Sequence, residues 1–135
     1  MLVLESLSAT LAWTTAAYLL ALGVLLLISP ARGRRFLAGF AQTASAHAVE
    51  LGLRILIGAA FILHAPRMAA GSLFVVLGWV LIGSSLVLAC MPWRWHARIA
   101  QRTVPMATRF TVPLGLASIV LGIGLGFALL SGPTG

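Results

Sequence analysis

Four long apolar segments dominate this sequence and limit the folds that it can adopt. They cover residues 9–29, 44–65, 69–91 and 110–131, and only the second contains charged residues. A helix needs about 20 mainly apolar residues to cross the hydrocarbon core of a bilayer, so each segment is long enough. Apolar and polar residues do not alternate, which argues against the strands of a transmembrane barrel. The pattern predicts an all-α integral membrane protein, with four helices bundled into one domain.

Composition supports the same class. The chain has 135 residues, of which 61% are hydrophobic and 8% are charged, and its mean hydropathy is +1.08. Soluble domains carry about 25% charged residues, because a surface that faces water needs them. A net charge of +7 would suit nucleic-acid binding in a soluble protein. Here the arginines lie beside the apolar segments and no separate basic domain is present, so we expect no nucleic-acid partner.

The arginines between the segments are distributed unequally. The first connection holds three of them and the third holds four, whereas the second holds only Arg67. The positive-inside rule places arginine-rich connections in the cytoplasm, so the first and third connections should be cytoplasmic. Both chain ends should then lie outside the cytoplasm. The arginines of the two rich connections are Arg32, Arg34, Arg35, Arg94, Arg98, Arg102 and Arg109.

The third connection has the spacing of an interfacial helix. If residues 93–104 are helical, its arginines recur every four residues along one stripe, beside a stripe formed by Trp95 and Ile99. A helix lying on the headgroups would sink its tryptophans and hold its arginines near lipid phosphates. An ordinary aromatic belt combined with a topology signal would have a similar composition. The predicted lipid interface consists of Trp93, Arg94, Trp95, Arg98 and Arg102.

The two halves of the chain resemble each other. Each reads as a helix, a proline, an arginine-rich connection and a second helix that begins with Leu-Gly-Leu, at residues 51–53 and 114–116. Because each half crosses the membrane twice, both halves share one orientation. The pattern predicts two parallel helix-pair repeats related by an axis along the membrane normal.

A family resemblance covers about residues 75–130. Pro92, Trp95, Ile99, Pro105 and Arg109, followed by a glycine-containing helix, resemble a group of small two-helix bacterial inner-membrane proteins of unknown function. The first half echoes this pattern without the tryptophan. The resemblance implies a bacterial cytoplasmic (inner) membrane location, and it implies no activity, cofactor or catalytic residue.

One polar cluster interrupts the second apolar segment. His47, Glu50 and Arg54 are spaced i, i+3 and i+7, which places them on one face of a helix. Charged residues within a membrane segment are costly and often functional. Arg54 lies close enough to the interface to extend toward it, and Glu50 is one turn away. Two interpretations stay open: a structural ion pair, or a protonatable site for transport or ligand binding.

The sequence predicts no metal, no cofactor and no catalytic residue. His47 and His64 are 17 residues apart, about 25 Å along one helix, and cannot share an ion. His47 and His96 would meet only if their helices are neighbours, with no further Cys, Asp or Glu expected nearby. The sequence has no recognisable nucleophile–base pair, phosphate loop or carboxylate pair, so we expect no enzyme.

Small residues recur every four positions in the last apolar segment, at Ser118, Gly122 and Gly126. Such rows let helix backbones approach closely in a membrane. The row can serve packing inside the bundle, or association with another copy or a larger complex.

These observations predict a small multi-pass membrane protein without catalysis. It would pack with or assemble a larger membrane complex, form a homo-oligomer, or associate with membrane lipids of anionic type. The alternative is a small transporter or channel coupled to protons or cations, with Glu50 as its titratable group. The scarcity of polar residues in the other three segments disfavours a lined pore.

Overall fold

The computed structural model describes residues 1–39 and 42–133, and the regular structure of these residues is entirely helical. Its elements are α1 (Leu2–Ile28), α2 (Pro30–Gly39), α3 (Ala44–His64), the 3-10 turn η1 (Ala65–Arg67), α4 (Gly71–Ala89), α5 (Trp93–Ala107), the 3-10 turn η2 (Thr108–Phe110) and α6 (Thr111–Ser131). Four of these helices, α1, α3, α4 and α6, are long and apolar enough to cross a membrane. The prediction of an all-α protein with four bundled apolar helices is confirmed.

Local sequence signals mark the helix ends. Pro30 has no backbone N–H to continue α1, and it begins α2 instead. The Thr43 hydroxyl accepts a hydrogen bond from the Ala46 N–H at 3.1 Å and caps the start of α3. Ala70 adopts a left-handed conformation with φ of 54°, and this sharp turn starts α4.

α1 begins at Leu2, earlier than the start predicted at residue 9. The polar side chains of its first turns are satisfied within the helix, since Ser6 and Thr10 donate to the carbonyl oxygens four residues before them. Glu5 also lies in the first turn, where a negative charge complements the helix dipole. The other three long helices lie within two residues of the predicted bounds.

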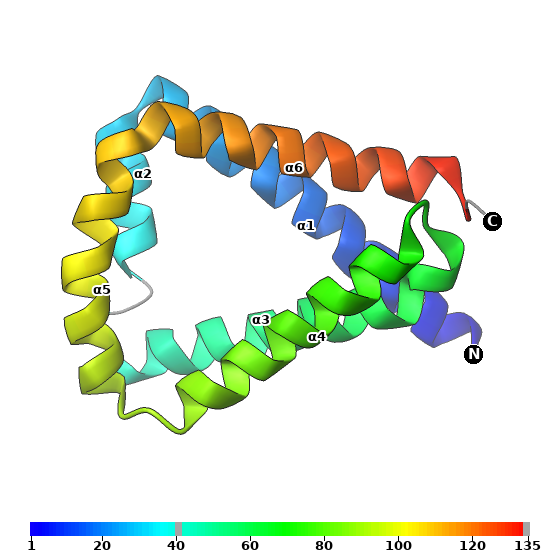
Figure 1. The fold of residues 1–135 in the computed structure, drawn as a ribbon, viewed down its shortest axis with the longest axis horizontal. Coiled ribbons are helices and arrows are strands. Elements are labelled where there is room, and N and C mark those ends of the chain that lie inside the picture. The colour runs from blue at the N-terminus through cyan, green and yellow to red at the C-terminus, as the bar shows by residue number, and fades with distance from the viewer. Residues whose placement is uncertain (40–41, 134–135) are drawn as a thin grey trace.

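The long helices form two antiparallel pairs, α1 with α6 and α3 with α4 (Figure 1). The pairs meet near the two chain ends, where α1 also packs against α3. Away from this point the pairs diverge, and the shorter helices α2 and α5 lie together across the opposite, wider end (Figure 1). The arginine-rich connections are therefore gathered at one end of the molecule.

Glycine allows the closest approach within each pair. A Cβ added at Gly78 in α4 would lie 2.5 Å from the carbonyl oxygen of Gly58 in α3. In the other pair, a Cβ at Gly23 in α1 would lie 2.7 Å from the carbonyl oxygen of Gly115 in α6, and a Cβ at Gly122 in α6 would lie 3.0 Å from that of Ala16 in α1. The backbones touch at these points because no side chain intervenes.

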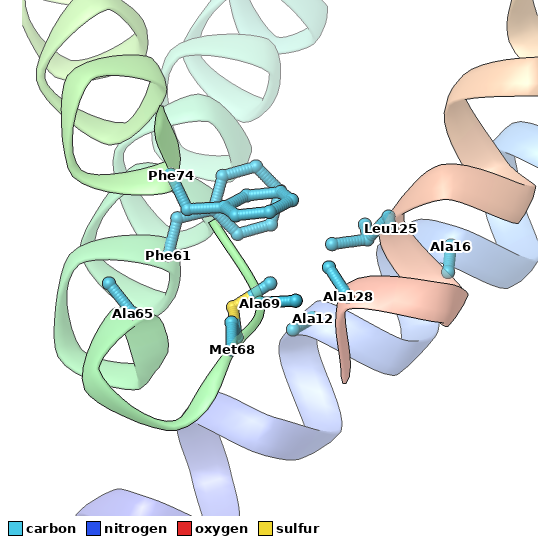
Figure 2. Close-up of a cluster of buried hydrophobic side chains, with 9 residues drawn as sticks. All are labelled: Ala12, Ala16, Phe61, Ala65, Met68, Ala69, Phe74, Leu125 and Ala128. Carbon is cyan, nitrogen blue, oxygen red and sulfur yellow. The ribbon is translucent and has the colours of Figure 1, made fainter. Parts of the chain in front are cut away.

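The main cluster of buried side chains lies where the pairs meet (Figure 2). The rings of Phe61 in α3 and Phe74 in α4 pack edge to face, with centroids 5.4 Å apart. The Ala69 N–H, just before α4, donates to the carbonyl oxygen of Ala128 in α6 at 2.9 Å. The cluster consists of Ala12, Ala16, Phe61, Ala65, Met68, Ala69, Phe74, Leu125 and Ala128.

The bundle buries little of its apolar surface. Between 17% and 28% of the most apolar stretch of each long helix is buried inside the molecule. Large hydrophobic side chains stay exposed along all four, among them Trp79, Leu121 and Phe127. Such a surface in water would be strongly unfavourable, whereas lipid accommodates it. The four candidate spans indicate a multi-pass membrane protein.

Each half of the chain contains a long helix, a shorter arginine-rich helix and a second long helix. This order is what a duplication would produce. The order of elements alone does not establish a duplication, so the two parallel repeats stay a prediction.

Candidate functional site

Helix α5 carries the predicted lipid interface. Pro92 precedes the helix, and its carbonyl oxygen accepts a hydrogen bond from the Trp95 N–H at 2.8 Å, which closes the first turn. The side chains of Arg94, Arg98 and Arg102 are exposed. Arg94 also lies 5.9 Å above the ring of Trp93, within the range of a cation–π contact.

Apolar side chains of α5 are exposed beside these arginines. Trp95 and Ile99 lie on the neighbouring stripe of the helix, with 61% and 50% of their surface accessible. Exposure of this apolar stripe to water is unfavourable. At the end of a membrane-spanning bundle, the bilayer interface can cover that side.

Helix α2 lies beside α5 and was not predicted as a helix from the sequence. It folds back onto α1, where the centroids of the Tyr18 and Phe36 rings are 6.2 Å apart. A Cβ at Gly33 would meet the Leu26 side chain at 2.6 Å, so the glycine permits this contact. Arg32, Arg34 and Arg35 of α2 are exposed. The signal that could have found α2 is Pro30, which suits the first position of a helix.

The charges at this end of the molecule are not balanced within the chain. The sequence holds nine arginines and two acidic residues. Glu5 is paired with Arg67, and Glu50 is paired with Arg54 and His96. Within the described residues, the seven arginines of α2, α5 and η2 therefore have no acidic partner. We refer to these seven arginines together with Trp93 and Trp95 as the basic face.

The polar cluster lies in the first turns of α3. Glu50 and Arg54 form an ion pair, with Oε1 and Nη2 3.1 Å apart. The second carboxylate oxygen of Glu50 lies 3.2 Å from Nε2 of His96 in α5. Arg54 also donates to the Ser84 hydroxyl of α4 at 3.4 Å. The cluster thus joins three helices, and Glu50 is its centre.

His47 completes the cluster from one turn before Glu50. Its ring lies beside that of His96, with centroids 4.6 Å apart and planes tilted by 40°. His47 is only 7% exposed, and its Nδ1 atom has no hydrogen-bond partner in the described structure. The sequence placed His47 and His96 on the same side of the membrane but did not assign His96 to the cluster. Only the packing of α5 against α3 brings them together.

The predicted packing row lies along the side of α6 that faces α1. Ser118 and Gly122 are buried on the side of α6 that faces α1. A Cβ at Gly126 would meet only the Trp13 ring, at 3.8 Å, which is ordinary contact. The contact with α1 is therefore close at Gly122 and looser at Gly126.

Comparison with protein-family models, with curated proteins and with solved structures finds no match for this chain. Its function must therefore be inferred from the basic face and the polar cluster.

Proposed function

We propose that this protein is a non-catalytic, multi-pass membrane protein whose basic face binds anionic lipid headgroups. The observation that carries the proposal is the set of seven exposed arginines that have no acidic partner in the described part of the chain, next to exposed tryptophans at one end of the bundle. The proposal includes the cytoplasmic membrane of a bacterium as the location, with the basic face in the cytoplasm.

The chemistry of these side chains suits lipid phosphate. A guanidinium presents parallel N–H donors that match two phosphate oxygens, and a basic residue near an anionic surface contributes about 1 kcal/mol to membrane attraction. Tryptophan favours the headgroup region, where its ring contacts acyl chains and its N–H reaches polar groups. The basic face combines both kinds of residue.

A topology signal alone accounts for less of the arrangement. The positive-inside rule requires only that arginines are numerous in a connection. It does not require that two arginine-bearing helices pack together, nor that α5 keeps an apolar stripe exposed beside its arginine stripe. An exposed apolar stripe beside a basic stripe is what a helix at the lipid interface needs, and the packing of α2 beside α5 adds further arginines to the same surface.

The transporter alternative is less well supported by the contacts of Glu50. One carboxylate oxygen is paired with Arg54 and the other with His96. A carboxylate that is held by two partners on two helices is suited to joining those helices. Arg54, which has 36% of its side chain accessible, keeps the pair connected to the interface.

Lipid-dependent thermal stability tests the proposal. The purified protein would be melted in neutral detergent with added phosphatidylglycerol or with phosphatidylcholine of the same acyl chains. We expect phosphatidylglycerol to raise the melting temperature more, and added salt to reduce the difference. Equal effects of the two lipids would contradict the proposal.

Two triple variants separate lipid recognition from topology. Replacing Arg94, Arg98 and Arg102 by Gln should abolish most of the phosphatidylglycerol effect, because the stripe loses its charge. Replacing the same three residues by Lys keeps the charge that directs insertion but removes the paired guanidinium donors. We expect the Lys variant to retain part of the effect. A Gln variant that responds as the wild type does would show that these arginines do not bind lipid.

A further inference from the structure

Three potential metal ligands from two helices converge in the polar cluster. His47 and Glu50 of α3 and His96 of α5 each offer one ligand atom, and these atoms all lie within 4.8 Å of one another. We propose that they form a binding site for a divalent transition metal of the zinc class, which would tie α5 to α3. This proposal does not depend on lipid binding by the basic face.

An unsatisfied nitrogen points to a ligand at this position. His47 is 7% exposed and its Nδ1 has no partner among the described residues. Buried polar nitrogens are nearly always hydrogen-bonded, because leaving one without a partner costs free energy. A helix of this kind could have used an apolar residue here at no such cost. Coordination to a metal ion would satisfy a ring nitrogen of this histidine and so offset the cost of burying it.

The donor set favours zinc over the hard cations. Two imidazoles and one carboxylate are typical of zinc sites that keep one coordination position open. Calcium and magnesium prefer sites made of oxygen ligands. Zinc–nitrogen bonds of about 2.0–2.1 Å place neighbouring tetrahedral ligand atoms about 3.3 Å apart. The three side chains would therefore rotate slightly inward around the ion.

Arg54 has a defined part in such a site. It holds Oε1 of Glu50 and leaves Oε2, which now contacts His96 at 3.2 Å, to face the ion. A group that holds the far oxygen of a ligating carboxylate fixes its orientation. The positive charge of Arg54 opposes that of the ion. Its side chain is 36% accessible, so water and counterions screen this repulsion.

Cobalt and zinc titrations test the site on the full-length protein, purified in detergent through a tag without histidines. Co²⁺ should bind at one equivalent and give the intense visible absorption of four- or five-coordinate cobalt. Zn²⁺ should displace it stoichiometrically, while Mg²⁺ should not. Weak absorption typical of six-coordinate cobalt, or no saturation near one equivalent, would overturn the proposal without any variant.

Histidine variants then locate the site. His47→Ala and His96→Ala should each weaken Zn²⁺ binding by about 100-fold or more, because loss of a ligand should cost at least as much as loss of an outer-shell partner, which costs about 10–100-fold. His64→Ala is the matched control, because His64 belongs to the same helix but contacts Ser8 at its far end. It should change the affinity by less than about threefold. Equal losses in all three variants, or unchanged binding in His47→Ala and His96→Ala, would overturn the assignment.

The shift in melting temperature caused by Zn²⁺ tests the site even if a histidine variant is less stable. Zn²⁺ should raise the melting temperature of the wild type and of His64→Ala, because an ion that binds only the folded state stabilises it. The shift should vanish in His47→Ala and His96→Ala, whatever their melting temperature without metal. A shift of wild-type size in either variant would contradict the proposed ligands.

Discussion

Glu50 is held by side chains from two helices. It accepts from Arg54 within its own helix and from His96 on α5. Its side chain is 18% exposed, so water replaces these partners poorly when they are removed. The two contacts have different consequences, because Arg54 compensates the charge of Glu50 while His96 connects it to another element.

At the residue scale, we expect Glu50→Gln to destabilise the protein by about 1–3 kcal/mol, since it leaves the Arg54 charge without its partner. The combined change Glu50→Gln with Arg54→Leu should be less harmful, because no unpaired charge stays behind. Thermal melting of both variants in the absence of metal gives the comparison.

The same variants address transport. Proton or cation flux into liposomes that contain the wild-type protein, abolished by Glu50→Gln in a well-folded variant, would support the transporter instead. If the double variant melts below Glu50→Gln, the ion pair is not the structural element that we infer.

At the scale of elements, glycine permits the close backbone contacts within each helix pair. α3 approaches α4 at Gly58 and Gly78, and α6 approaches α1 at Gly122. In a membrane, burial of apolar surface does not drive association, because lipid is as apolar as the side chains. Close backbone contact is therefore the main attraction.

Gly122→Leu should weaken the α1–α6 pair by about 1–3 kcal/mol, because the new side chain would displace Leu20 and the Ala16 carbonyl. Leu121→Ile is the matched control, since Leu121 is the adjacent residue and is 62% exposed. Its effect should stay below about 1 kcal/mol. Melting in detergent measures both, and equal melting temperatures would show that the contact is unimportant.

The long helices were predictable because their length and composition alone decide what can cross a bilayer. The pairing of α1 with α6 was not predictable, because Ser118 and Gly122 can pack against any helix that has a small side chain at the facing position. α2 was missed because its ten residues carry too few apolar side chains for a clear pattern, and its fold depends on Tyr18 and Leu26 of α1.

The polar cluster was predictable only in part. The spacing of His47, Glu50 and Arg54 places them on one helix face, whereas His96 reaches them only through tertiary packing.

At the scale of the whole molecule, the two ends differ in charge. The basic face occupies one end, and at the other end the single arginine, Arg67, is paired with Glu5. The pair neutralises that end, so the unpaired positive charge of the described residues lies at the basic face. The positive-inside rule counts basic residues alone, and by that count the basic face has seven arginines against one. The chain ends lie at the neutral end (Figure 1).

Thiol labelling tests the orientation. In spheroplasts of a bacterial host, a membrane-impermeant maleimide should label a Pro66→Cys, Cys90→Ala variant, because Pro66 is exposed at the neutral end. The native Cys90 is exposed near the start of α5 and should react only after the membrane is permeabilised. Labelling of Cys90 in intact spheroplasts would reverse the proposed topology.

The divergence of the two helix pairs has a mechanical consequence. In the proposed orientation, a molecule that is narrow where its pairs meet and broad where α2 and α5 lie would displace unequal areas of the two lipid leaflets. The lipids around the narrow end must tilt inward to follow its outline. Its insertion into a flat bilayer therefore creates bending stress, and a bilayer that already curves to match the taper relieves this stress.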